Sequence, residues 1–331
     1  MVNREIKIGD SIRRIREARG ITQKELGDAL GVSEPTVSKL ESNQRQLKAR
    51  EIPVIYEKLR CTASELFGGD QTALIGKSFF PRLTGEFGEA ADEIRRIMER
   101  LGRQAANLID LEKTLGIKVN ADIPRSDLPV GRTRGEINQQ ATSLAMHLRD
   151  KWDLGIDPIH DLKSLLEQHG IIWTYWRLPE NIGLSGLCAP IGERVIILIN
   201  AGDITQRQRF SLGHELCHAL VDARDEVVLT RLESNRDGRG QYSQIEKRAD
   251  FFSGKFLMSL QSATLLAKQR GFDLHDPDDR GIIQLAYFFG LSSPAVLVTL
   301  RSYEVITFKK YNELKDTLPK SPKWDFSSAD P

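Results

Sequence analysis

Apolar side chains recur at helical spacing over residues 8–60, where glycines and hydroxyl side chains separate short helical stretches. Ile8, Ile12 and Ile15 share one face of a first helix, because residues three and four apart lie on the same side. Two more short helices are predicted, each after a hydroxyl side chain that can cap it: residues 23–30 after Thr22 and residues 34–41 after Ser33. Two short helices joined by a tight turn are typical of a helix-turn-helix, whose second helix enters the DNA major groove.

A longer amphipathic stretch follows over residues 86–117, where apolar side chains alternate between four- and three-residue steps. Glu112 occupies one expected apolar position, and Gly102 lies in the middle of the stretch. These interruptions favour a helix packed on the protein over a long free coiled coil, although the same stripe is a candidate dimerisation element. We therefore expect residues 69–135 to form a linker that contains one helix.

From residue 136 the pattern alternates between helical periodicity and β-rich runs. Helices are predicted over 137–152, 158–170, 205–220 and 246–258, and strands over 171–176, 186–189 and 194–200. The chain is thus predicted to be α+β and mostly helical. An all-helical domain would cover residues 5–68, an α+β domain with a small β-sheet residues 136–305, and a C-terminal extension residues 306–331. We expect this extension to be disordered from Asn312 onward, because it is polar and rich in proline.

The composition of the whole chain says little about its binding partners, but it bears on the cellular compartment of the protein. The chain has 331 residues, 40% of them hydrophobic, and a net charge of +1, which suits two or more packed domains. Cys61, Cys188 and Cys217 are widely spaced and odd in number, which argues against a disulfide framework. The N-terminus lacks an apolar signal region, and no apolar run approaches a membrane span. We therefore expect a cytoplasmic protein without a membrane partner.

Residues 214–218 read His-Glu-Leu-Cys-His inside one of the predicted helices. His214 and His218 are one turn apart on the same face, close enough to share a metal ion. Glu215 lies beside that face, where it can accept a proton from a water at the metal. Cys217 points away from the ligand face and is expected to pack in the core. The alternative interpretation is a core helix with two incidental histidines.

A second predicted helix supplies carboxylates at helical spacing. Glu246 and Asp250 are four residues apart and share a face. Catalytic zinc usually has three protein ligands and one open position, so we predict one Zn²⁺ per chain held by His214, His218 and Glu246. Asp250 is expected to bind the free ring nitrogen of a ligand histidine, which fixes the tautomer of the ring.

The N-terminal pattern resembles the DNA-binding domain of the XRE (Cro/C1-type repressor) family over about sixty residues. The matching stretch is ITQKELGDALGVSEPTVSKLESN, residues 21–43. The resemblance implies residues that contact bases or phosphates of double-stranded operator DNA, namely Gln23, Ser33, Glu34, Thr36, Ser38, Lys39, Asn43, Gln44 and Arg45. The alternative is a helical packing module that does not contact DNA.

The C-terminal pattern resembles the ImmA/IrrE family of zinc metallopeptidase-like domains over residues 136–300. The matching residues are the β-run that ends in Asn200, then RFSLGHELCH at 209–218 and EKRADFFSGKFLM at 246–258. The resemblance implies a zincin-like fold, zinc ligands at His214, His218 and Glu246, and Glu215 as the catalytic base. Ser253, Gly254 and Ser259 depart from the usual residues of the family, but none is expected to touch the metal.

Together the two resemblances imply a DNA-binding transcriptional regulator that carries a zinc-dependent endopeptidase. Its substrate would be a regulatory protein such as an XRE-type repressor, and groove-reading regulators of this kind usually bind DNA as homodimers. A first alternative is a repressor or antitoxin-like regulator whose metal domain is a sensor or a structural module. A second is a general metallopeptidase with a vestigial N-terminal module.

Overall fold

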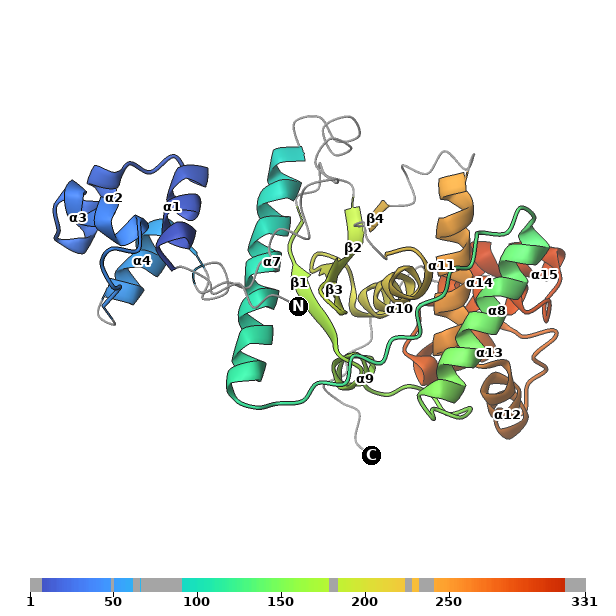
Figure 1. Cartoon of the computed structure of the whole chain (residues 1–331). Coiled ribbons are helices and arrows are strands. Elements are labelled where there is room, and N and C mark those ends of the chain that lie inside the picture. Colours follow the sequence, from blue (N-terminus) through green and yellow to red (C-terminus); the bar gives the residue numbers. More distant parts are fainter. Residues whose placement is uncertain are drawn as a thin grey trace, which may run out of the picture. The chain divides into compact units, whose positions relative to one another are not determined.

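The structure is a computed structural model of the whole chain (Figure 1), and it describes residues 8–48, 51–61, 66, 91–178, 184–223, 228–231 and 241–318. The chain forms two compact units: an N-terminal unit of Met1–Val119 with Ile191–Glu193, and a C-terminal unit of Asn120–Pro190 with Arg194–Pro331. Helices dominate both described parts, and one small sheet belongs to the C-terminal unit. The predicted class, α+β and mostly helical, is confirmed.

The N-terminal unit begins with four short helices: α1 (Ile8–Ala18), α2 (Gln23–Leu30), α3 (Glu34–Glu41) and α4 (Ile52–Leu59). Thr22 and Glu25 form the expected capping box at the start of α2, each side chain accepting a hydrogen bond from the other's backbone amide. Gly31 ends α2 at φ 66°, a left-handed conformation that favours glycine. The helices enclose a core of their own, built from Ile12, Ile15, Leu26, Val37, Leu40, Ile55 and Leu59.

Helix α7 (Ala91–Thr114) confirms the helix predicted within the linker. Its first half buries Ile94, Met98 and Leu101, which are each 1% exposed. Towards the C-terminal end of the helix the apolar side chains are exposed to solvent: Leu108 is 40% and Leu111 54% exposed. The predicted linker residues 69–90 lie outside the described part of the chain.

The sheet of the C-terminal unit has the strand order β1-β3-β2-β4. Its strands are β1 (Ile171–Trp176), β2 (Leu184–Ile191), β3 (Arg194–Asn200) and β4 (Val228–Arg231). β1 pairs in parallel with β3, from Ile171 opposite Val195 to Trp176 opposite Asn200. β4 pairs antiparallel with β2. The sequence predicted the first three strands, with β2 shorter than observed, but it did not predict β4.

The described part of the C-terminal unit has eight helices: α8 (Arg134–Lys151), α9 (Leu162–Gln168), α10 (Thr205–Val221), α11 (Gln241–Leu257), α12 (Leu260–Arg270), α13 (Asp279–Phe289), α14 (Ser293–Ser302) and α15 (Phe308–Thr317). Of these, α9 contacts β1 and α10 contacts β3. α11 contacts both α8 and α10, so it lies at the centre of the helical layer (Figure 1). α8 starts at Arg134 because Thr133 and Glu136 form a capping box, and α9 starts only at Leu162, after the Asp161 cap.

Residues 120–131 were expected to be linker, but they form an ordered segment along the C-terminal unit. The Ser126 amide donates to the Leu220 carbonyl at 2.9 Å, and Leu128 accepts from Arg248 at 3.0 Å. Ile123, Leu128 and Val130 pack against the main core. The segment therefore connects the C-terminal end of α10 with the middle of α11. A loop rich in breaker residues did not suggest this order.

The C-terminal extension is more ordered than predicted. Helix α15 includes Asn312–Thr317, which we expected to be disordered, because the Thr307 side chain caps its start and Leu314 is buried. Residues 319–331 lie outside the described part. Among the described helices none is by itself long and apolar enough to cross a membrane, and α13 with α14 meets that test only as a pair bent by 98°.

Candidate functional sites

The candidate metal centre lies between α10 and α11, two helices in close contact. All of α10 from Ser211 to Val221 is buried. A Cβ atom on Gly213 would come within 2.6 Å of the Ser253 hydroxyl, so glycine here allows the two helices to approach. Ser253 donates to the Phe210 carbonyl at 2.7 Å. The Ser253 hydroxyl is thus satisfied by bonding to the facing helix.

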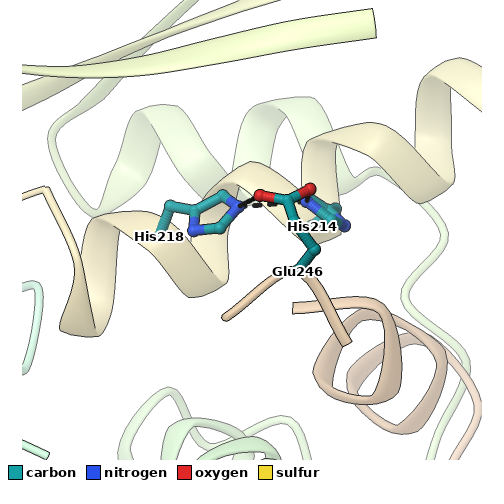
Figure 2. Close-up of side chains that lie close together, drawn as sticks. All are labelled: His214, His218 and Glu246. Atoms are coloured by element: carbon teal, nitrogen blue, oxygen red, sulfur yellow. Dashed lines mark hydrogen bonds and ion pairs between the residues drawn. The ribbon is translucent and has the colours of Figure 1, made fainter. Parts of the chain in front are cut away.

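His214, His218 and Glu246 converge as the sequence predicted (Figure 2). The two Nε2 atoms are 3.0 Å apart. The Glu246 carboxylate lies 3.4 Å from His214 Nε2 and 3.5 Å from His218 Nε2. One ligand atom from each of the three residues lies within 4.8 Å of the others, and all three residues are buried. This group could hold a metal ion.

The chemistry of these donors fits a catalytic type of metal site. Two imidazole nitrogens and one carboxylate oxygen form a ligand set used by zinc peptidases. Three protein ligands leave one coordination position for water or substrate, whereas structural zinc sites are closed by four. Cys217 is not part of this group in the described residues, and its side chain belongs to the hydrophobic core cluster.

Glu215 follows His214 directly in α10, and its carboxyl group lies against Gly186 of β2. Its side chain is fully buried, and neither carboxylate oxygen forms a hydrogen bond of normal geometry among the described residues. The Thr230 hydroxyl of β4 is near enough to lower the pKa of Glu215, but burial has the larger effect. Burial raises the pKa of this carboxyl group. Gly186 of β2 provides the space, because a Cβ atom there would come within 2.6 Å of Glu215 Oε1. A buried carboxyl group of raised pKa is suited to accept and return a proton near neutral pH.

Each ligand histidine is held by a carboxylate at its other ring nitrogen. His214 Nδ1 lies 2.8 Å from Asp250 Oδ1, as predicted. His218 Nδ1 lies 2.9 Å from Asp222 Oδ2, a contact that the sequence analysis missed. Asp222 is also bound by the Arg248 guanidinium at 2.5 Å, and Arg248 is 1% exposed. The spacing of four residues from His218 to Asp222 was a readable signal, since it places both side chains on one helical face.

The pKa shifts follow from this arrangement. Burial opposes the charged form of both rings, but the hydrogen bonds that the protonated ring donates to Asp250 and Glu246 outweigh it and raise the pKa of His214. Asp222 and Glu246 raise the pKa of His218 in the same way. The pKa of Glu246 is lowered despite burial, because both histidines donate to it. A metal ion would replace these protons at the centre of the group.

The predicted DNA contacts lie on α2, α3 and the turn that follows. Six of these residues have exposed or partly exposed side chains: Ser33, Glu34, Thr36, Ser38, Lys39 and Gln44. Ser33 and Thr36 share a hydrogen bond of 2.9 Å between their hydroxyl groups. These residues leave the exposed face of α3 available to a ligand.

Three other predicted DNA contacts are engaged within the domain. The Gln23 amide donates to Glu41 at 2.7 Å, and Glu41 also forms a buried ion pair with Arg16. Asn43 accepts from the Gly9 amide and donates to Asp10. Arg45 binds Glu51 through both terminal nitrogens. Their side chains hold α1, α2 and the end of α3 together, a role that the sequence analysis did not foresee.

Two sequence families match this chain. Residues 12–66 match the family described as Helix-turn-helix (HTH_3), and residues 167–301 match the IrrE N-terminal-like domain family (Peptidase_M78). The chain is therefore a fusion of a helix-turn-helix domain with an IrrE N-terminal-like domain. The first match supports DNA binding, and the second indicates a metallopeptidase-like domain.

Comparisons with whole proteins add little. No curated protein matches the chain. The crystal structure of ComR from Streptococcus suis is 11% identical, with 96% of this chain and 78% of ComR covered at a TM-score of 0.18. Bacillus thuringiensis PlcR, solved in complex with the peptide PapR7 and DNA, is 12% identical, with 94% and 95% covered at a TM-score of 0.20. Such low scores carry no argument about this fold or its function.

Proposed function

We propose that the chain is a DNA-binding transcriptional regulator that carries a zinc-dependent endopeptidase, with a regulatory protein such as an XRE-type repressor as substrate. The observation that carries the catalytic part is the position of Glu215. It is a buried carboxyl group without a hydrogen bond of normal geometry in the described structure, next to His214, His218 and Glu246. A purely structural metal site has no need of such a group, which is costly to bury.

The roles of the residues follow from their positions. His214, His218 and Glu246 would hold Zn²⁺, which when bound polarises the scissile carbonyl and lowers the pKa of a water molecule. Glu215 accepts the proton of the attacking water and returns it to the leaving amine. Asp250 and Asp222 hold the two imidazole rings in the tautomer that presents Nε2 to the metal.

DNA binding through α3 is supported by the exposed polar face of that helix and by the family match. One helix-turn-helix reads one half-site, so we propose that the regulator acts as a homodimer. The open apolar side chains Leu108 and Leu111 at the end of α7 make this helix the candidate dimerisation element.

The test is cleavage of XRE-type proteins encoded beside this gene by the zinc-loaded full-length chain. Glu215→Gln should abolish cleavage and keep the bound zinc. Glu313→Gln, an isosteric change on the exposed α15, should leave both unchanged. Metal analysis that finds no zinc in the folded protein would overturn the proposal, and so would equal cleavage by the Glu215→Gln variant. Bound zinc without any cleavage would instead favour a regulator with a metal-dependent sensor.

A further inference from the structure

A cationic pocket lies at the N-terminal end of α8, against α11 and α14. It consists of two cavities of about 360 and 200 Å³ that share Arg134 and Phe251 in their walls. We call this pair the α8 pocket. All its lining residues belong to the C-terminal unit. Arg132 and Arg134 precede the part of the chain that matches the IrrE N-terminal-like family, so this pocket extends beyond the matched region.

The charge of the α8 pocket is unbalanced. Four cations line it, namely Arg132, Arg134, Lys247 and Arg301, against the single carboxylate of Glu304. No carboxylate of the described residues lies within ion-pair distance of any of these four cations. Like charges gathered around one cavity repel each other, so an anion in the cavity would be attracted by all of them.

Unsatisfied polar atoms point to the same kind of ligand. The Arg301 Nε atom is buried, and it has no hydrogen-bond partner in the described structure. The same holds for Asn138 Oδ1, whose amide nitrogen is bound to the Ser302 carbonyl at 2.9 Å. Both residues line the smaller cavity. Buried polar groups are almost always satisfied, so an unpaired donor and an unpaired acceptor beside one cavity fit a polar ligand there.

The start of α8 adds two backbone donors. Thr133 and Glu136 satisfy each other's amide groups through the capping box. The amide groups of Arg134 and Gly135 donate no hydrogen bond within the described residues. A Cβ atom on Gly135 would meet nothing closer than 4.0 Å, so the first turn is open on this side. Free amide groups at a helix N-terminus favour anions.

The opposite wall of the pocket is apolar. Ile137 is 2% and Phe251 9% exposed, and the Arg134 guanidinium lies 5.8 Å from the Phe251 ring centroid. Pockets that bind small molecules usually combine apolar walls with a few convergent polar groups. We propose that the α8 pocket binds a small molecule with a doubly charged oxyanion and an apolar part, such as an aromatic phosphate ester. A cavity with an apolar wall suits this ligand better than a DNA backbone, which needs an open cationic surface.

The occupied pocket would act on the metal centre through α11. Lys247 and Phe251 face the pocket, whereas their direct neighbours Glu246 and Asp250 face the metal site. The proposal does not depend on peptidase activity, because it concerns binding to a different face of this helix.

The experiment is a calorimetric titration of the full-length chain with phenyl phosphate at constant ionic strength. Inorganic phosphate tests the need for the ring, and phthalate tests whether carboxylates replace the phosphate. We expect saturable binding that is weakened about tenfold or more by Arg134→Gln and by Lys247→Gln, since each removes a charged donor. Lys268→Gln, an exposed change on α12, should leave the affinity unchanged.

Several results would overturn the proposal. The first is that none of the three anions shows saturable binding. The second is that Lys268→Gln weakens binding as much as the pocket variants do. The third is that binding requires Zn²⁺, because the anion would then bind at the metal centre. Competition by duplex DNA without small-molecule binding would also overturn it, because the cations would then contact a nucleic acid backbone. Both test residues are exposed, so the variants should fold, and their unfolding curves verify this.

Discussion

The carboxylate that holds His218 offers a sharp test of the metal centre. Asp222 Oδ2 contacts the ring at 2.9 Å, and its other oxygen binds Arg248 at 2.5 Å. Asp222→Asn keeps the size of the side chain but removes its charge. Removing such a carboxylate from a ligand histidine typically costs 10–100-fold in metal affinity, which corresponds to about 1.4–2.8 kcal/mol. We expect zinc binding to weaken within this range.

The same substitution also affects folding, so the two effects must be separated. Arg248 is 1% exposed, and without its partner it becomes an uncompensated buried charge, which costs about 3–5 kcal/mol. The double variant Asp222→Asn with Arg248→Gln removes that charge and should recover part of the stability. It should not recover zinc affinity, because His218 still lacks its carboxylate.

The assay is a competition titration against a chromophoric chelator, with urea unfolding of the metal-free proteins measured in parallel. Asp250→Asn provides the matched comparison at His214, since Asp250 contacts the other ring at 2.8 Å. A folded Asp222→Asn protein that binds zinc within about threefold of the wild-type affinity would refute this reasoning, given the expected range. Recovery of affinity in the double variant would show that Asp222 acts only through the fold.

Three further predictions address other parts of the chain. Burial lowers the pKa of Lys255 to about 8, so between about pH 8 and pH 10 the folded chain binds fewer protons than the unfolded chain. Stability in urea should therefore rise over that interval, and Lys255→Met should remove the rise. Thr36→Ala with Lys39→Ala should weaken operator binding and reduce its salt dependence in a gel-shift assay, without loss of zinc. Gly186→Ala should displace Glu215 and lower cleavage of a substrate while zinc content stays at one per chain.

The helical parts of the chain were readable because their signals are local. The capping box of Thr22 and Glu25 and the four-residue spacing of His214 and His218 each depend on residues within one turn. Glu246 was placed correctly because it lies on a second helix whose own periodicity is clear. The position of a residue along a helix determines on which face its side chain lies. The grouping of His214, His218 and Glu246 could therefore be predicted from the periodicity of two helices.

What the sequence did not reveal depends on contacts between distant segments. β4 has only four residues, and its pairing with β2 defines it more than its own pattern does. Arg248 binds Asp222 across two helices, and nothing in its neighbourhood distinguishes it from a surface arginine. Asn43 bonds to Gly9 and Asp10, more than thirty positions away, and these bonds were not foreseen. Its predicted phosphate contact stays a prediction.

Helix α11 explains why so many of these distant contacts matter for one site. Glu246 reaches the metal group, and Asp250 holds one ligand ring. Arg248, between them in sequence, holds the carboxylate of the other ring. Lys247 lies on another face, in the wall of the α8 pocket. Because a helix moves as a rigid element, a shift of α11 against α10 would change a metal ligand and both ring supports together. The affinity of the proposed centre for a metal ion would therefore depend on the packing of these two helices, and a ligand in the α8 pocket would act on it through α11.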